Sequence, residues 1–121
     1  MLLEKRNKHR YPSLAKAKVI GVDCGETLLK DLSIIGCCLA SAGDGEVKPG
    51  NHYKIEIIPE EAAEIGKFDI IAELKRSKHE DNTIELGFAI LESPKGKQFQ
   101  RYVDYLAWRS EAGLSSGESL L

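Results

Sequence analysis

The chain has 121 residues, of which 42% are apolar, 30% are charged and only 4 are prolines. This composition excludes a disordered tail, and a chain of this length is expected to fold as one domain around one core. The 17 basic and 19 acidic side chains nearly cancel, which excludes a wholly basic nucleic-acid binder.

The N-terminal segment differs from the rest in charge. Residues 1–20 carry six basic groups and one acidic group, so the remaining chain is net acidic. Residues 1–13 are expected to form a flexible basic arm, and the folded domain is expected to span residues 14–109.

The body of the domain shows the alternation of apolar and polar residues that is typical of half-buried strands. An apolar stretch at 26–41 is interrupted at Asp31, Ser33 and Gly36, which predicts two strands that are joined or bent there. Turn residues separate these segments. Together they predict about six strands, in residues 14–22, 26–41 (two strands), 51–58, 68–76 and 83–91.

The apolar spacing changes after Pro94, because Phe99, Tyr102, Val103 and Leu106 follow a helical period. The pattern predicts an amphipathic helix over about 97–109 and a frayed polar tail over 110–121. Tyr105 and Trp108 are expected to pack on the core, with a partner surface as the alternative. The fold predicted from these elements is a six-stranded antiparallel β-barrel with a C-terminal helix.

Several classes of function are not expected from the sequence. No metal-ligand spacing, nucleophile elbow or phosphate-binding loop occurs, so we expect neither an enzyme nor a bound metal or cofactor. The three cysteines are expected to be reduced and mostly buried. Apolar runs are far shorter than the ~20 residues of a membrane helix. No signal-peptide pattern follows the basic start, so no membrane insertion and a cytoplasmic location are expected.

Two short motifs place polar groups where the strand pattern gives no structural reason for them. The first is RxxxR, formed by Arg6 and Arg10. The second is DxSxxG, formed by Asp31, Ser33 and Gly36. Arginine can pair with phosphate oxygens or with the O6 and N7 edge of guanine, and a carboxylate can accept from guanine N1 and N2. The two motifs together favour a guanine-nucleotide site.

Each motif also has a structural explanation. A basic N-terminal segment is often a solvated or generic anion-binding tail, and DxSxxG is often a turn in which Asp and Ser bond their own backbone. The combination is more specific. Two motifs about twenty residues apart, ahead of this strand pattern and a C-terminal helix, resemble the PilZ domain, a bacterial receptor for cyclic di-GMP.

The resemblance covers roughly residues 4–109, and it extends to Pro49-Gly50 and to a late glycine, Gly87. It implies that Arg6 and Arg10 contact the guanines and phosphates and that Asp31, Ser33 and Gly36 line the barrel side of the site. Gly87 is expected to let the ligand approach the strand closely. Gly36-Cys37 departs from the Gly-Gly of many members, which bears on affinity and on whether one or two nucleotides bind.

The function implied by the resemblance is a non-enzymatic cyclic di-GMP receptor. Under this hypothesis the arm changes conformation when cyclic di-GMP binds. The protein then signals to an unidentified protein target in motility, exopolysaccharide or biofilm control. The first alternative is a PilZ-like protein-interaction module that does not respond to nucleotide. The second, a nucleic-acid binder that uses the basic arm, is disfavoured by the acidic body and by the single aromatic residue near the arm, Tyr11.

Overall fold

The computed structural model describes residues 9–43, 45–92 and 97–119, with side chains as far as residue 111. It is built from strands followed by a single long helix. The strands are β1 (Tyr11–Pro12), β2 (Lys16–Val19), β3 (Thr27–Leu32), β4 (Gly36–Ser41), β5 (His52–Ile58), β6 (Phe68–Glu80) and β7 (Thr83–Glu92). A 3-10 turn, η1 (Glu61–Ala63), follows β5, and the C-terminal helix is α2 (Gln98–Ser119).

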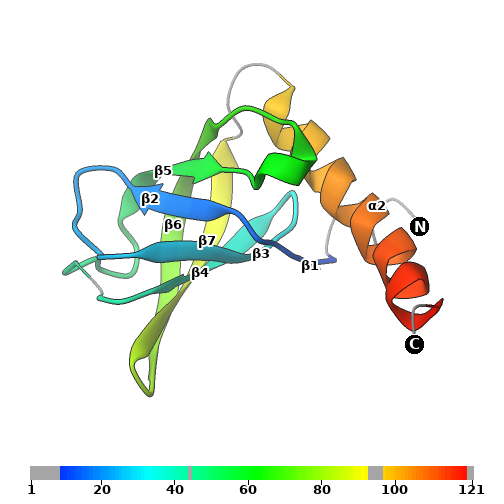
Figure 1. The fold of residues 1–121 in the computed structure, drawn as a ribbon. Coiled ribbons are helices and arrows are strands. Elements are labelled where there is room, and N and C mark those ends of the chain that lie inside the picture. Colours follow the sequence, from blue (N-terminus) through cyan, green and yellow to red (C-terminus); the bar gives the residue numbers. More distant parts are fainter. Residues whose placement is uncertain (1–8, 44, 93–96, 120–121) are drawn as a thin grey trace.

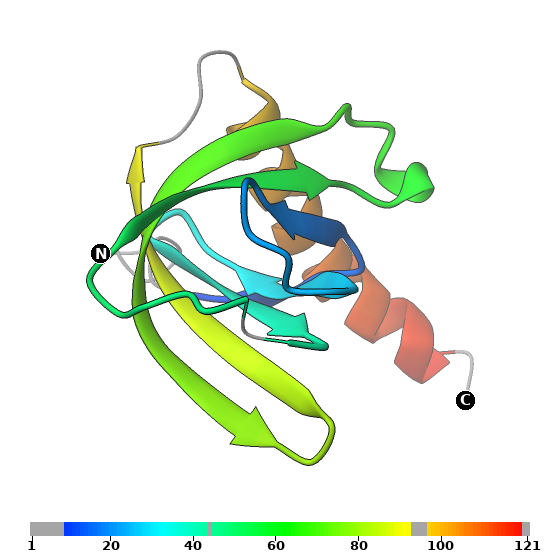
Figure 2. The same cartoon turned by 90° about the vertical axis from the view of Figure 1, so that its left-hand side faces the viewer.

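The strands form a closed barrel. Their order is β1-β3-β2-β5-β6-β7-β4, and an additional pairing of β3 with β4 closes the ring of six strands from β2 to β7. Every pairing is antiparallel. The ring is visible in Figure 2, and the β6–β7 hairpin projects beyond it in Figures 1 and 2. The predicted six-stranded antiparallel barrel with a C-terminal helix is confirmed.

The interior of the barrel is filled by the apolar residues that alternate along each strand. On β6 the predicted inward set is buried, and β7 follows the same rule as far as Phe88. Alternation puts successive side chains on opposite faces, so the same pattern leaves polar side chains on the outer wall. The fully buried strand residues include Leu29, Leu32, Leu39, Ile55, Ile57, Ile70, Leu74 and Leu86.

Helix α2 lies across one end of the barrel (Figures 1 and 2). Phe99 and Tyr102 each meet the ring of Phe68 on β6, with ring centroids 6.0 Å apart in both pairs. The predicted apolar stripe of the helix is therefore confirmed. Its predicted end at 109 is wrong, because α2 continues to Ser119. No proline follows Leu106, and a helix that has already formed propagates at little cost.

Trp108 does not pack on the core as expected, since it is 63% exposed. The buried stripe of α2 runs through Tyr102, Val103, Leu106 and Ala107, and a residue two positions after Leu106 points away from that stripe. Tyr105 is half-buried and packs against the edge of the core, as predicted.

The predicted arm also needs a correction. Tyr11–Pro12 pairs with Leu32 and Asp31 of β3, and the Tyr11 side chain is buried. The chain therefore joins the barrel before the predicted start at residue 14. In the described part of the chain, no helix has the length and apolar character needed to cross a membrane.

Candidate functional site

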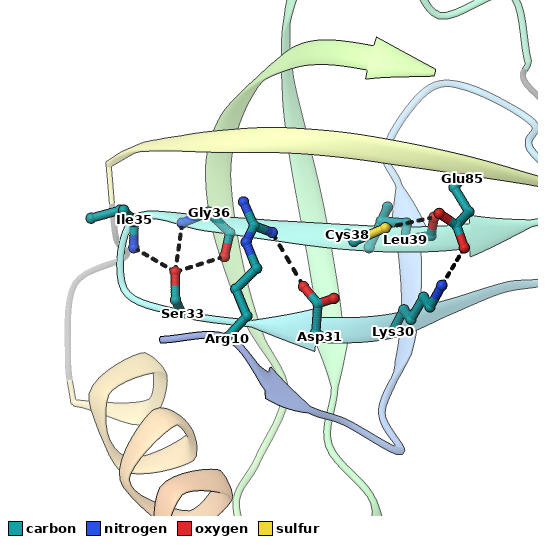
Figure 3. A network of polar contacts seen from close by, with 9 residues as sticks. All are labelled: Arg10, Lys30, Asp31, Ser33, Ile35, Gly36, Cys38, Leu39 and Glu85. Atoms are coloured by element: carbon teal, nitrogen blue, oxygen red, sulfur yellow. Dashed lines mark hydrogen bonds and ion pairs between the residues drawn. The ribbon is translucent and has the colours of Figure 1, made fainter. Parts of the chain in front are cut away.

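Arg10 of the first motif meets Asp31 and Gly36 of the second motif on the outer wall of the barrel, beside β1, β3 and β4 (Figure 3). Arg10, just ahead of β1, donates a hydrogen bond from Nη1 to Oδ1 of Asp31 at 3.2 Å. Both side chains are partly exposed, at 40% for Arg10 and 25% for Asp31. An exposed ion pair contributes only about 0–1 kcal/mol, so a ligand can replace it at small cost.

A β-bulge turns Asp31 toward the solvent. The register between β3 and β4 shifts between Leu29 and Asp31, which leaves Lys30 as an extra residue. Strict alternation after the buried Leu29 would point Asp31 into the core, and the bulge instead places Lys30 and Asp31 both outside. This local irregularity explains the break in the apolar pattern at Asp31.

Gly36 leaves room for Arg10. A Cβ atom at Gly36 would lie 2.8 Å from Nη2 of Arg10 and 2.9 Å from the carbonyl oxygen of Phe88. Neither distance is possible for a real side chain, so any other residue here would displace the guanidinium and strain the contact with β7. The absence of a side chain at Gly36 therefore allows Arg10 to occupy its position.

Ser33 holds the turn between β3 and β4 and does not face the solvent. Its hydroxyl is fully buried and accepts hydrogen bonds from the backbone N–H groups of Ile35 (3.2 Å) and Gly36 (3.1 Å). It also donates to the carbonyl oxygen of Gly36 at 3.3 Å. Ser33 therefore orients Gly36 and supports the site from behind, which matches the structural explanation of DxSxxG for this one residue.

The wall beside Asp31 carries an ion pair and one thiol, and a second thiol lies behind it in the core. Lys30 donates to Glu85 on β7, and this hydrogen bond raises the pKa of Lys30 and lowers the pKa of Glu85. Cys37 points into the core, where burial raises its pKa to about 12. Cys38 is the outward neighbour of Asp31, and burial likewise raises its pKa. Both thiols are protonated at neutral pH and lack the activation of a nucleophile.

Gly87 lies on the same wall, one strand beyond Cys38, with which it pairs. On its other side it pairs with Arg76 of β6, a residue that belongs to neither motif. The sequence signal for it is the end of the apolar alternation after Leu74. Arg6 lies outside the described residues. The structure thus brings together Arg10, Asp31 and Gly36, puts Ser33 behind them, and places Gly87 further along the wall.

A second polar network joins the segment after Arg10 to α2. Arg109 donates to the carbonyl oxygen of Pro12 and to Glu60, both at 2.6 Å. The hydroxyl of Tyr102 donates to Glu60 at 2.6 Å and lies 2.8 Å from that of Ser13. Burial and the hydrogen bond to Glu60 raise the pKa of Tyr102, which stays protonated. Strand β1 is thereby tied to the helix.

A shallow groove lies on the exposed side of α2, near η1. It has a volume of about 380 Å³ and includes the exposed Trp108 in its lining, together with Ala63, Ile65, Arg101, Asp104 and Tyr105. No group of three or more potential metal ligands occurs among the residues that the structure describes.

No protein-family model and no curated protein matches the sequence. Solved structures do match the fold. The Bacillus subtilis inhibitor of motility MotI/DgrA matches 85% of this chain, with a TM-score of 0.69 and 19% identity. YcgR of Escherichia coli in complex with c-di-GMP matches 92%, with a TM-score of 0.65 and 19% identity. The PilZ domain of E. coli YcgR with c-di-GMP matches 87%, with a TM-score of 0.61 and 22% identity.

The three matches differ in how much of each solved structure they cover. The match covers 49% of the MotI/DgrA chain and 49% of the YcgR chain, but 95% of the isolated PilZ domain. The chain therefore spans about half the length of the two larger proteins. Its barrel and helix have the fold of a PilZ domain, as predicted.

Proposed function

Because the chain has the fold of a PilZ domain, we propose that it is a non-enzymatic receptor for cyclic di-GMP, with its binding site on the outer wall at β3 and β4. One observation carries this proposal: Arg10 and Asp31, which belong to different motifs, form an exchangeable ion pair over Gly36. Two structures of the same fold hold c-di-GMP, which supports the choice of ligand.

In the proposed complex the ligand separates Arg10 from Asp31 and uses both. The guanidinium of Arg10 donates to a phosphate or to guanine O6 and N7, and the carboxylate of Asp31 accepts from guanine N1 and N2. Arg6 lies four residues before Arg10, so both arginines can reach one compact, doubly charged ligand. Ser33 acts through the turn that presents Gly36.

We assign the output of the receptor to the link between β1 and α2. A displacement of Arg10 would move the adjacent strand β1 (Tyr11–Pro12). Arg109 on α2 donates a hydrogen bond to the carbonyl oxygen of Pro12, so it connects β1 to the helix. A shift of β1 would therefore reach α2 and change the surface that a protein target contacts. Motility control is the output suggested by the likeness to an inhibitor of motility.

The exposed groove beside Trp108 supports a second candidate function, a PilZ-like interaction module that does not respond to nucleotide. In that case the groove holds a protein partner whether or not a nucleotide is present, and the ion pair of Arg10 and Asp31 is only structural.

Calorimetric titration separates these functions. Cyclic di-GMP, GTP and a short single-stranded oligonucleotide are titrated into the protein, into Arg10→Ala and into the control Lys18→Ala, which removes an exposed charge on β2. We expect the protein to bind cyclic di-GMP and neither of the other two ligands. Arg10→Ala should weaken the binding free energy by about 1.5–3 kcal/mol, and Lys18→Ala should leave it unchanged. If the unmodified protein does not bind cyclic di-GMP, the result would favour the interaction module. Binding of the oligonucleotide would favour a nucleic-acid binder.

A further inference from the structure

One row of paired residues crosses four neighbouring strands on the outer wall. Asp31 of β3 pairs with Cys38 of β4, Cys38 with Gly87 of β7, and Gly87 with Arg76 of β6. Adjacent strands lie about 4.8 Å apart, so the backbones of Asp31 and Arg76 are separated by roughly 14 Å along the wall. The row has an acid at one end, an arginine at the other and two small residues between them.

A second β-bulge turns Arg76 onto this wall. The register between β6 and β7 shifts between Leu74 and Arg76, which leaves Lys75 as the extra residue. Alternation after the buried Leu74 would point Arg76 inward, but the bulge brings it opposite Gly87 with its side chain exposed. Asp31 and Arg76 thus both reach the outer wall through a bulge.

Gly87 provides a place for the Arg76 side chain. A Cβ atom at Gly87 would lie 3.2 Å from Cγ, 3.4 Å from Nε and 3.5 Å from Cζ of Arg76. The arginine therefore extends across the glycine from its stem to its guanidinium. Gly36 accommodates Arg10 in the same way, so two glycines on one wall each accommodate an arginine, one from the side of β1 and one from β6.

The guanidinium of Arg76 is available for a ligand. It forms no ion pair and no side-chain hydrogen bond with any residue that the structure describes. Glu85, whose pKa the positive charge of Arg76 helps to lower, is already bonded to Lys30. The neighbouring cations of β6 differ in this respect, because Lys75 pairs with Glu73 and Lys78 pairs with Glu80.

We propose that Arg76 is a further nucleotide-binding residue, which donates to the phosphate or base acceptors of the ligand held by Arg10 and Asp31, and that Gly87 serves to position Arg76. This inference rests on the proposed function. It gives Gly87 a different role from the one expected from the sequence, in which the glycine lets the ligand itself approach the strand.

The first test is calorimetric titration of the full chain with cyclic di-GMP. Arg76→Ala is expected to raise Kd on the order of tenfold or more, because a charge-assisted hydrogen bond is lost. Arg76→Lys keeps the charge but not the planar fork and is expected to restore the affinity only partly. Lys78→Ala is the matched control, since it removes a cation two residues further along the same strand. Equal losses in Arg76→Ala and Lys78→Ala would overturn the proposal.

The second test is a double-mutant cycle with Gly87→Ala. The atoms nearest to the added methyl group belong to the flexible Arg76 side chain, so the barrel can accommodate it. If Gly87 positions Arg76, Gly87→Ala weakens binding in the unmodified protein and has little further effect in Arg76→Ala. An equal loss in both backgrounds would show that Gly87 meets the ligand directly, and would overturn the assigned role of Gly87.

The outcomes also separate this inference from the proposed function. If the unmodified protein binds cyclic di-GMP and Arg10→Ala does not, while Arg76→Ala binds normally, the receptor function stands and the role of Arg76 is overturned. If the unmodified protein does not bind cyclic di-GMP, both are overturned.

Discussion

The ion pair of Arg10 and Asp31 is the contact that the ligand replaces in the proposed complex. Its two partners are partly exposed, so it adds little to the free energy of unfolding. Each partner nevertheless occupies a costly position, since Asp31 requires a bulge and Arg10 requires a glycine beneath it. Positions of this kind are characteristic of functional sites.

Replacing Asp31 with alanine is expected to separate affinity from stability. The variant should lose about 1–3 kcal/mol of binding free energy for cyclic di-GMP, because guanine N1 and N2 are left without an acceptor. Its melting temperature should change little, and cyclic di-AMP should bind the unmodified protein poorly. Calorimetry and thermal unfolding give the two quantities, and lost stability with intact affinity would contradict the role of Asp31 as a base reader.

Cys37 is expected to make stability depend on pH in the alkaline range. Its pKa rises from 9.0 to about 12 on folding because the thiol is buried. The unfolded chain therefore loses this proton first, and the stabilising effect is complete below pH 9.0 and disappears as the pH rises toward about 12. In urea unfolding, the free energy of unfolding should fall more steeply with rising pH for the unmodified protein than for Cys37→Ala. Parallel profiles of the two proteins would contradict this prediction.

At the scale of elements, the regular parts of the strands could be predicted and the irregular parts could not. The period of two located β5, β6 and β7, because alternation with burial determines a strand directly. The bulges at Lys30 and Lys75 depend on pairing with a partner strand, which is a tertiary property. The break at Asp31 was visible as an interruption, whereas Arg76 lay in a continuous polar run.

The contact between β1 and α2 leads to a prediction about signalling. Arg109→Ala removes the hydrogen bonds to Pro12 and Glu60. We expect cyclic di-GMP to bind this variant nearly as tightly, but the ligand-induced change in fluorescence of Trp108, the single tryptophan, should be lost. Arg101→Ala is the control, since Arg101 lies on the same helix and, among the described residues, its side chain hydrogen-bonds to Gln98 and not to β1. An unchanged fluorescence response in Arg109→Ala would contradict the proposed link.

The described part of the chain is a closed barrel with a helix across one end (Figures 1 and 2), and the candidate site lies on the outer wall of the barrel (Figure 3). The six strands of the ring and the C-terminal helix were predictable from periodicity, whereas the short strand β1 was not. The candidate site was predictable in Arg10, Asp31 and Gly36 only because two motifs were considered together. Burial of Ser33 and exposure of Trp108 could not be predicted, since both depend on how a turn and a helix pack on the finished barrel.

The most direct test of the proposed site is a titration of the isotopically labelled protein with cyclic di-GMP, in which two-dimensional NMR monitors the backbone amide signals. We predict that the largest shifts cluster at Arg10, Asp31, Gly36 and Gly87, with a smaller group at Arg109. Both groups should saturate at the same ligand concentration. Shifts confined to the far wall of the barrel, at β2 and β5, or no shifts at all, would contradict the proposed site.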